Sequence, residues 1–287
     1  MTAPDIANVA VLGAGTMGKG IAQVCAQAGY RVKLFDANHA TLEQAISDIE
    51  AVLNLAVEKG KITAAQKLQC LSHLMIVKNM SDLQCDFAIE AVVEDLGIKQ
   101  SLLLQLEQVN ESDTILATNT SSIPVTQIAS RLQRPQNFVG LHFFNPAPLM
   151  KLVEVVAGAS TSEVVVEHAK HFAVSVGKVP VVTRDSPGFI VNRVARHFYV
   201  EALKLAEERA ASFEDIDMLA RDSGFKMGPF ELMDLIGMDV NFAVTKSLYD
   251  GFLGEPRFRP SRLQQQKIDG GHLGRKTGRG FYSYPPK

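Results

Sequence analysis

The chain has 287 residues, of which 46% are hydrophobic, and its formal net charge is −2. This length is sufficient for two domains, and the small net charge gives no reason to expect nucleic acid or a membrane surface as a partner. No apolar run approaches the roughly 20 residues of a membrane span, and the N-terminus lacks the basic and apolar regions of a signal peptide, so we expect a cytoplasmic protein.

A glycine-rich turn follows the first predicted strand, residues 9–12. It reads Gly13-Ala14-Gly15-Thr16-Met17-Gly18 and leads into a predicted helix. A G-x-G-x-x-G turn in this setting is typical of a dinucleotide site: the first glycine permits the turn, the second lets a phosphate approach, and the third lets the helix pack on the sheet. The alternative is a glycine-rich turn in an unrelated α/β protein.

The second predicted strand, residues 31–35, ends at an acidic residue. Asp36 follows Gly15 by 21 positions, where a dinucleotide fold places the carboxylate that binds the adenosine ribose diol. A carboxylate there repels the 2′-phosphate of NADP, and residues 37–39 contain no arginine to accept one. The sequence therefore predicts NAD as cofactor; otherwise Asp36 is an ordinary helix cap.

The order of the remaining elements predicts two domains. Strands alternate with helices up to about residue 183, which favours a doubly wound parallel sheet, and only helical or irregular segments follow. We predict an α/β Rossmann-type domain over residues 1–185, for NAD binding, and an all-α domain over 186–287, for substrate binding and dimerisation. The further strands are expected at 87–91, 114–117, 138–142, 152–156 and 179–183, and the main helices at 41–59, after Thr63, at 189–211, and from 213 and 229.

The three cysteines show no spacing typical of a metal site or a disulfide framework. Cys25 and Cys85 lie in apolar segments, so we expect buried free thiols in a reducing compartment. We predict no bound metal.

His142 ends a predicted strand, at the sheet edge where open α/β folds place their sites. Glu154 lies twelve positions further on, in the next predicted strand. A histidine whose ring is oriented by a carboxylate can act as a general base. The alternative is a buried structural histidine.

Polar residues cluster in Thr118-Asn119-Thr120-Ser121-Ser122, directly after another predicted strand. Such a cluster at a strand end has little reason to be there for packing. The alternative is that Ser121 or Ser122 only caps the helix expected near Pro124.

Six motifs together resemble the 3-hydroxyacyl-CoA dehydrogenase family, including its short bacterial 3-hydroxybutyryl-CoA dehydrogenases, over essentially the full length. In chain order they are the glycine turn 13–18, Asn119-Thr120-Ser121-Ser122, Leu141-His142-Phe143-Phe144-Asn145-Pro146, Pro187-Gly188-Phe189-Ile190-Val191-Asn192-Arg193, Gly228-Pro229-Phe230-Glu231-Leu232 and Lys276-Thr277-Gly278-Arg279-Gly280-Phe281.

The resemblance implies NAD-dependent, reversible oxidation of a 3-hydroxyacyl-CoA to a 3-oxoacyl-CoA. It implies a catalytic His142–Glu154 pair, with Ser121 and Asn192 at the reacting oxygen; from the residues alone, Asn192 would be a solvated helix position. The cofactor-side residues that it implies are Asp36, Glu94, Lys99 and Asn119. Thr118 stands where relatives often have serine, beside the implied site.

A CoA thioester carries phosphates, and the resemblance places Lys59 and Lys61 where a basic residue can meet the CoA nucleotide. The alternative is a solvated charge pair at a helix end, and Lys276 and Arg279 rank lower as CoA contacts. We expect a short acyl group such as acetoacetyl, with a dicarboxylic group such as 3-hydroxyadipyl as the second possibility. Arg193 or Arg196 could then meet the distal carboxylate, although an arginine at a helix start is more often a surface or interface residue.

Apolar residues are too plentiful in the predicted helical domain for one small domain to bury, so we expect a homodimer through residues after about 187. Two other functions remain open. One is an NAD-dependent dehydrogenase of a free hydroxy acid, of the gulonate type, which the Phe143-Phe144 pair disfavours. The other is a non-catalytic NAD-binding protein, which the presence of all four implied catalytic residues disfavours.

Overall fold

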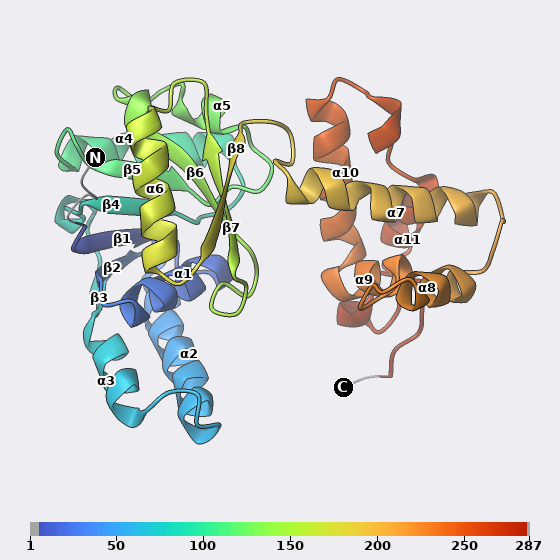
Figure 1. The fold of residues 1–287 in the computed structure, drawn as a ribbon, viewed down its shortest axis with the longest axis horizontal. Coiled ribbons are helices and arrows are strands. Elements are labelled where there is room, and N and C mark those ends of the chain that lie inside the picture. Colours follow the sequence, from blue (N-terminus) through green and yellow to red (C-terminus); the bar gives the residue numbers. More distant parts are fainter. Residues whose placement is uncertain (1–5, 286–287) are drawn as a thin grey trace. The chain divides into compact units, whose positions relative to one another are not determined.

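The computed structural model describes residues 6–285 and divides into two compact units. Unit 1 is Met1–Ser186 and unit 2 is Pro187–Lys287. Unit 1 combines a sheet with helices, and unit 2 is helical (Figure 1). The predicted fold class, an α/β Rossmann-type unit followed by an all-α unit, is confirmed.

Unit 1 contains an eight-stranded sheet with the order β3-β2-β1-β4-β5-β6-β7-β8. Its strands are β1 (Asn8–Leu12), β2 (Arg31–Phe35), β3 (Leu74–Val77), β4 (Phe87–Glu90), β5 (Ile115–Thr118), β6 (Phe138–Phe143), β7 (Leu152–Ala157) and β8 (Val179–Arg184). The central strands are mostly apolar, apart from polar residues at or near their carboxyl ends, because parallel strands covered on both faces have no solvent side. The last four residues of β1 and the middle four of β7 are buried as well, and Phe87 stacks on Phe172 with ring centroids 4.3 Å apart.

Every residue of β4, β5 and β6 is buried, so the centre of the sheet holds the core of unit 1. The structure differs from the sequence prediction at two strands. No strand was predicted at β3, which pairs with β2 at the sheet edge and is mostly not buried. The sheet was predicted to be parallel, whereas β7 is antiparallel to β6. The connection between β6 and β7 carries no crossover helix, which is why β7 can return antiparallel.

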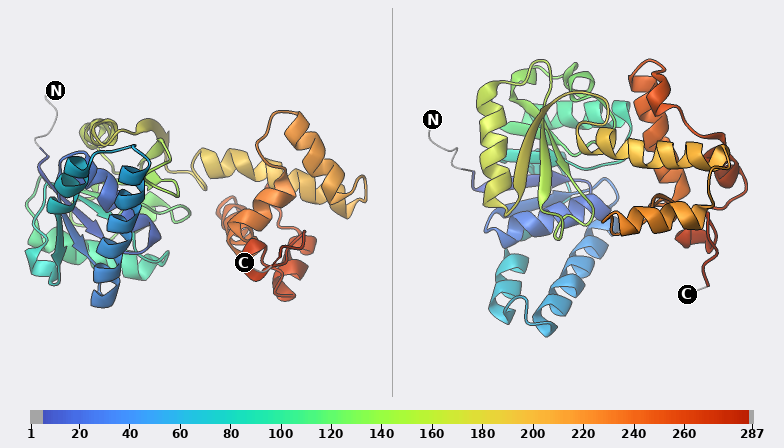
Figure 2. Two further views of the ribbon diagram at one scale, coloured as in Figure 1. Left: turned by 90° about the horizontal axis from the view of Figure 1, so that it is seen from below. Right: turned by 45° about the vertical axis from the view of Figure 1, so that its right-hand side comes forward.

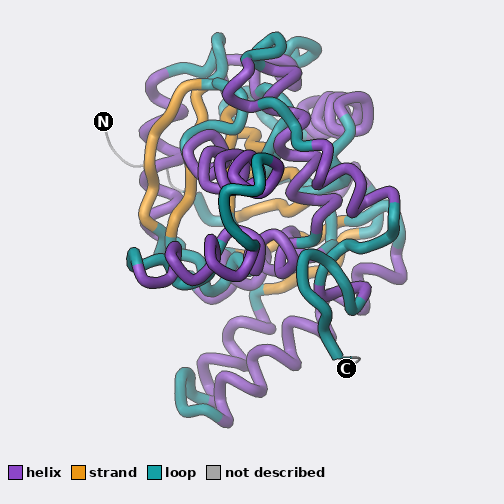
Figure 3. The backbone as a smooth tube through the Cα atoms, turned by 90° about the vertical axis from the view of Figure 1, so that its right-hand side faces the viewer, coloured by secondary structure: helices purple, strands orange, loops and turns teal. Residues whose placement is uncertain are grey.

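The helices of unit 1 are α1 (Thr16–Gln27), α2 (His39–Glu58), α3 (Ala64–Ser72), α4 (Leu96–Val109), α5 (Val125–Ala129) and α6 (Glu163–Ser175). The predicted cap of α3 is confirmed: the Thr63 hydroxyl accepts from the Gln66 N–H, and the Gln66 side chain accepts from the Thr63 N–H. Helices α2 and α3 form a helical hairpin that extends away from the sheet (Figure 3).

The main elements of unit 2, among its described residues, are α-helices (Figure 2). They are α7 (Val191–Glu207), α8 (Phe213–Asp222), α9 (Pro229–Ile236), α10 (Met238–Gly251) and α11 (Arg262–Asp269). Helix α7 is shorter than the predicted 189–211 because Phe189 and Arg209 have positive φ angles of 51° and 59°, which a right-handed helix does not allow. The rings of Phe213, Phe230 and Phe281 pack together at its core.

The cysteine prediction is confirmed: Cys25, Cys70 and Cys85 are buried free thiols. Burial raises the pKa of the Cys25 and Cys85 thiols to about 12, so both stay protonated and unreactive at neutral pH. Within residues 6–285, no helix has the length and apolar character needed to cross a membrane.

Candidate active site

The glycine turn joins β1 to α1, and each glycine has a distinct steric environment. Gly13 has φ +100°, and a Cβ there would lie 2.6 Å from the Ala91 carbonyl oxygen. A Cβ on Gly18 would lie 1.7 Å from the Gly13 oxygen, so only glycine lets α1 pack this closely. Around Gly15, by contrast, a Cβ would meet no atom of the described chain within 4 Å. The backbone is therefore open at the position where a phosphate would approach.

The start of α1 suits an anion. Gly15 and Thr16 are exposed, and the first turn, all of which the structure describes, holds no acidic side chain. The N–H groups of this turn and the positive end of the helix dipole therefore point to accessible space. These features fit the pyrophosphate of NAD.

Asp36 lies directly after β2 and contacts the glycine turn. Its Oδ2 accepts from the Ala14 N–H at 2.8 Å, and its Oδ1 accepts from the Asn38 N–H at 2.9 Å. Each carboxylate oxygen can accept a second hydrogen bond. The carboxylate is thus held beside the phosphate turn in an arrangement that fits a ribose diol.

Glu94 holds the turn that carries Ser121. Its Oε1 accepts from the Thr120 hydroxyl at 2.6 Å and from the Ser121 and Ser122 N–H groups at 3.0 and 3.1 Å. Burial by itself would raise the pKa of the Glu94 carboxyl, but the Lys99 ammonium and the donors of this turn outweigh it and hold that pKa below its usual value.

The serines of this turn do not cap α5, contrary to the alternative considered from the sequence. The N-cap residue of α5 is Pro124, and no side chain caps it among the described residues. The bond from Ser121 to Glu94 uses the backbone N–H, not the hydroxyl. The Ser121 hydroxyl is therefore not needed for the turn itself.

Asn119 ties the end of β5 to the end of β6. Its side-chain Oδ1 accepts from the Phe143 N–H at 2.8 Å, and its own N–H donates to the Glu90 carbonyl at 2.7 Å. Lys99 is 1% exposed and lies 2.7 Å from Glu90 Oε1 and 3.2 Å from Glu94 Oε2. Its ammonium thus faces two carboxylates from inside unit 1.

His142 and Glu154 are directly opposite each other in the antiparallel pair of β6 and β7. His142 Nδ1 lies 2.7 Å from Glu154 Oε2, and both side chains are buried. A carboxylate on Nδ1 fixes the ring and its tautomer, so that Nε2 becomes the nitrogen for proton exchange. The unpredicted antiparallel turn is what brings these two residues together.

Asn192 is the second residue of α7 and is partly buried. Arg196, one helical turn later, differs from the expected surface or interface position. It is 3% exposed, and its Nη1 donates to the Asn241 carbonyl and the Thr245 hydroxyl, both at 2.8 Å. Its guanidinium is therefore engaged inside unit 2.

An apolar groove of about 650 Å³ lies between α1, α2 and the loop after β6. Ile49 and Val52 of α2 line one side, and Pro146 to Leu149 line the other. Lys178 holds this loop: its buried ammonium donates to the Ala147 and Met150 carbonyls at 2.6 and 2.9 Å.

Both lysines suggested for CoA are exposed at the end of α2. Lys59 is the C-cap residue of α2, and Lys61 follows two residues later. In unit 2, Lys276 is paired with Asp239 at 2.6 Å, which agrees with its lower rank as a CoA contact.

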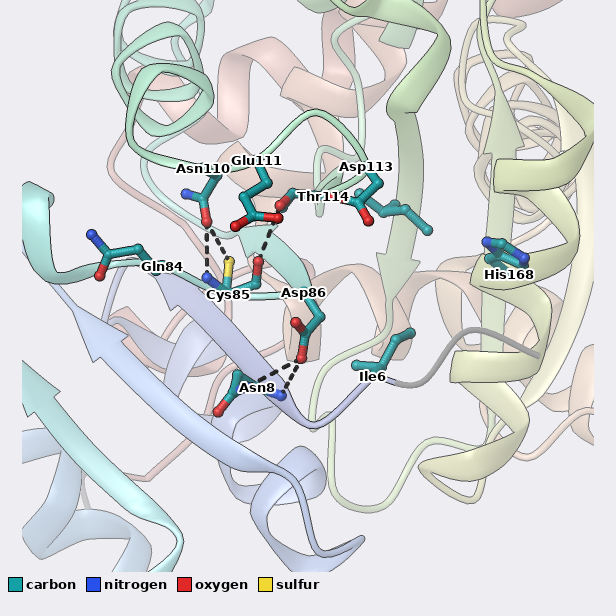
Figure 4. Close-up of a pocket in the computed structure, with 11 residues that line it drawn as sticks. Ile6, Asn8, Gln84, Cys85, Asp86, Asn110, Glu111, Asp113, Thr114 and His168 are labelled. Atoms are coloured by element: carbon teal, nitrogen blue, oxygen red, sulfur yellow. Dashed lines mark hydrogen bonds between the residues drawn. The ribbon is translucent and has the colours of Figure 1, made fainter. Parts of the chain in front are cut away.

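A second cavity, of about 540 Å³, lies at the amino ends of β1, β4 and β5, opposite the glycine turn (Figure 4). Its polar side chains mostly hold backbone. Asp86 Oδ2 accepts from the Asn8 N–H at 2.8 Å, Asn110 Oδ1 accepts from the Cys85 N–H at 2.8 Å, and Thr114 donates to the Cys85 carbonyl at 3.1 Å. This end of the sheet thus serves as structure.

The glycine turn, the Asp36 carboxylate beside it and the His–Glu pair on the same sheet are the arrangement expected of the nucleotide-binding part of a dehydrogenase. Residues 8–186 match the family model for the 3-hydroxyacyl-CoA dehydrogenase NAD binding domain, and residues 188–284 match that for the C-terminal domain. The chain belongs to the 3-hydroxyacyl-CoA dehydrogenase family, and its cofactor is NAD.

Individual relatives agree with this family. The chain is 49% identical to 3-hydroxyadipyl-CoA dehydrogenase of Escherichia coli over 98% of its own length, but spans only 59% of that protein. It is 41% identical to 3-hydroxybutyryl-CoA dehydrogenase of Clostridioides difficile, covering 96% of this chain and 99% of the relative. The crystal structure of (S)-3-hydroxybutyryl-CoA dehydrogenase from Ralstonia eutropha matches with a TM-score of 0.95 at 37% identity, covering 98% of this chain and all of that one.

Sequence reasoning missed two residues that support the site. Glu90 is a charged residue at the end of an otherwise apolar buried strand, and that contrast was an available signal. Lys178 lies directly before β8 and belongs to no local motif, and only its contacts with a loop about 30 positions earlier reveal its role.

Proposed function

We propose that the protein is an NAD-dependent L-3-hydroxyacyl-CoA dehydrogenase that interconverts (S)-3-hydroxyacyl-CoA and 3-oxoacyl-CoA. The observation that carries this proposal is the buried His142–Glu154 pair at the same sheet as the glycine turn, with 2.7 Å between Nδ1 and Oε2. Family membership and the names of the relatives support the same reaction.

In the oxidative direction, His142 Nε2 takes the proton of the 3-hydroxyl group, and Glu154 stabilises the imidazolium that forms. In the reductive direction, the same nitrogen returns the proton to the 3-oxo oxygen. NAD⁺, when bound, supplies the acceptor for the hydride that leaves C3. A proton and a hydride thus leave the substrate at adjacent atoms, oxygen and C3.

Ser121 and Asn192 position the reacting oxygen through hydrogen bonds. Ser121 is on the turn that Glu94 holds, and Asn192 is in the first turn of α7. The glycine turn, Asp36, Glu94, Lys99 and Asn119 form the cofactor side. Lys99 is buried and contacts Glu94, and Glu94 holds the turn that carries Ser121. Both residues therefore act on the cofactor side through this turn.

The apolar groove suits the pantetheine arm of a CoA thioester, because its walls are apolar side chains of α2 and the loop after β6. Lys59 and Lys61 at the end of α2 are exposed cations for the CoA phosphates. Neither lysine belongs to the proton-transfer machinery, so their loss should weaken acyl-CoA binding alone.

A short acyl group is the proposed substrate class, as in the 3-hydroxybutyryl-CoA dehydrogenases that the chain resembles over almost their full length. The 49% identity to a 3-hydroxyadipyl-CoA dehydrogenase favours a dicarboxylic acyl group as the second candidate. Arg196 is engaged inside unit 2 and does not support a distal carboxylate site of its own.

The test is the rate of NADH oxidation at 340 nm with acetoacetyl-CoA and with 3-oxoadipyl-CoA, for the wild type and His142→Ala. We expect turnover that falls by roughly two or more orders of magnitude in the variant, and the ratio of kcat/KM values assigns the acyl class. Turnover that survives the substitution would remove His142 as the base. Measurable NADH binding without turnover of either acyl-CoA would move the assignment to a free hydroxy acid or to a non-catalytic role.

We further propose a homodimer formed through unit 2 and a cytoplasmic location. Exposed apolar side chains on α7, α8 and the segment after α8 support the dimer; they include Val194, Leu219 and Phe225. Three buried free thiols fit a reducing compartment.

A further inference from the structure

Glu90 lies at the end of β4 and is fully buried, yet it carries a carboxylate. Its Oε1 accepts from the Val92 N–H at 2.8 Å and lies 2.7 Å from the Lys99 ammonium. Its Oε2 accepts from the Thr118 hydroxyl at 2.7 Å. Glu90 therefore connects three segments: the ends of β4 and β5, and the first turn of α4.

Lys99 also contacts a second carboxylate, that of Glu94. Its ammonium lies 3.2 Å from Glu94 Oε2, so one buried cation stands between Glu90 and Glu94. Glu90 compensates the buried charge of Lys99 on one side and thereby fixes where the ammonium can meet Glu94. A buried ammonium without such a partner would be costly.

The other oxygen of Glu94 holds the turn that carries Ser121. It accepts from the Thr120 hydroxyl and from the Ser121 and Ser122 N–H groups. An unbroken series of polar contacts thus runs from Thr118 through Glu90, Lys99 and Glu94 to the backbone of Ser121.

We propose that Glu90 is a positioning residue, which acts through Lys99 and Glu94 to hold the Ser121 hydroxyl in place for the reacting oxygen. This inference rests on the proposed function of Ser121. A buried ion pair often adds little stability over apolar residues of the same volume, whereas it does specify geometry. Displacement of a substrate-positioning group by about 1 Å can cost 10²-fold in rate.

The experiment compares variants at both ends of the Thr118–Glu90 bond. Thr118→Val keeps the shape of the side chain and deletes the bond to Glu90 together with the one that Thr118 accepts from the Thr120 N–H at 3.3 Å, while Thr118→Ser keeps both. Thr114→Val is the matched control. Thr114 lies directly before β5, and its hydroxyl also makes a buried hydrogen bond, to the carbonyl of Cys85 just before β4, but at the opposite end of the sheet. Glu90→Gln removes the charge of Glu90 and leaves the hydroxyl of Thr118 available to the Thr120 N–H, so it tests Glu90 by itself.

Two readouts are compared: kcat and KM for acetoacetyl-CoA, and hydrogen–deuterium exchange of the backbone over residues 118–124. We expect Thr118→Val to lower kcat by about tenfold with a smaller change in KM, and to speed exchange of the Ser121 and Ser122 amides. Thr118→Ser should recover most of this loss, and Thr114→Val should affect neither readout.

Measuring Thr118→Val again in an enzyme that already carries Ser121→Ala distinguishes a positioning role from a general loss of stability. In Ser121→Ala enzyme, Thr118→Val should cost less than about twofold further, because coupled residues are not additive. The full tenfold cost in that background, or equal effects of Thr118→Val and Thr114→Val, would overturn the proposal. If the wild type reduces no acyl-CoA, the proposed function fails. Hydrogen–deuterium exchange still tests this inference in that case, because unchanged exchange rates of the Ser121 and Ser122 amides in Thr118→Val and Glu90→Gln would overturn it.

Discussion

At the residue scale, the clearest prediction concerns the charge of Glu154. Glu154→Gln keeps a group that can accept from His142 Nδ1, but it cannot stabilise an imidazolium. We expect kcat for acetoacetyl-CoA reduction to fall by roughly 10²–10⁴-fold, while the Kd of NADH, measured by fluorescence, stays within about twofold because the glycine turn is untouched. A loss of NADH affinity equal to the loss of kcat would show that Glu154 supports the fold rather than the proton transfer.

The lowered pKa of Glu94 leads us to expect that the free energy of unfolding depends on pH. Its folded-state pKa is lowered, so its contribution is fully present above the unfolded value of about 4.3 and is lost as the pH falls through the folded value. The difference in the free energy of unfolding between wild type and Glu94→Gln should therefore be constant near pH 7 and shrink below about pH 4. Urea denaturation from pH 7 to pH 3 measures it, and a difference independent of pH would contradict this prediction.

At the element scale, substitutions of two glycines in the β1–α1 turn should affect NADH binding and stability separately. Gly15→Ala adds a Cβ that meets no atom of the described chain within 4 Å, and Gly15 has an ordinary φ of −68°. We expect the melting temperature to stay the same and the Kd of NADH to rise by about tenfold or more, which is about 1.4 kcal/mol, because the methyl group occupies the space of the phosphate. Unchanged NADH affinity would place the pyrophosphate elsewhere.

Gly18→Ala is the matched contrast, because its Cβ would lie 1.7 Å from the Gly13 oxygen. Separation of α1 from β1 to relieve this contact should destabilise unit 1 by about 1–3 kcal/mol. Thermal unfolding distinguishes the two glycines: Gly18→Ala lowers the midpoint and Gly15→Ala does not.

The loop after β6 gives a second prediction at this scale. Lys178→Met removes the ammonium that holds the Ala147 and Met150 carbonyls, and so loosens one wall of the apolar groove. We expect KM for acetoacetyl-CoA to rise by about fivefold with the Kd of NADH unchanged. Lys33→Met is the control, because Lys33 also donates to two loop carbonyls, of Asp82 and Gln84, away from the groove. Equal KM values for both variants would exclude a role for the loop in acyl-CoA binding.

The elements also show what could be predicted from the sequence. The glycine turn, the Thr63 cap and the central strands were predictable because each depends on residues within a few positions of one another. The reversal of β7 was not, because nothing local distinguishes an antiparallel apolar strand from a parallel one. Lys178 was missed for the same reason, because its partner Ala147 lies 31 positions away. Glu90 did carry a local signal, its charge in an otherwise apolar strand, but its partner Thr118 lies 28 positions away, so its role could not be predicted.

At the scale of the whole molecule, unit 2 leaves part of its apolar surface exposed. Leu203 and Phe230 are buried in the core of the unit. Val194, Leu219 and Phe225 remain exposed, by 67%, 61% and 54%. Exposed apolar side chains gathered in one domain are typical of a surface that another protein covers, and a second copy of the chain is the proposed partner.

Light scattering coupled to size exclusion should therefore give the mass of a dimer at micromolar concentration. Leu219→Asp should shift the protein toward the monomer, because burying an unpaired carboxylate in the interface is costly. Leu68→Asp is the matched control: Leu68 is as exposed, at 66%, but lies on α3 in unit 1, so this variant should stay dimeric. A wild-type monomer would contradict the proposed dimer, and a Leu219→Asp dimer together with a Leu68→Asp monomer would move the interface to unit 1.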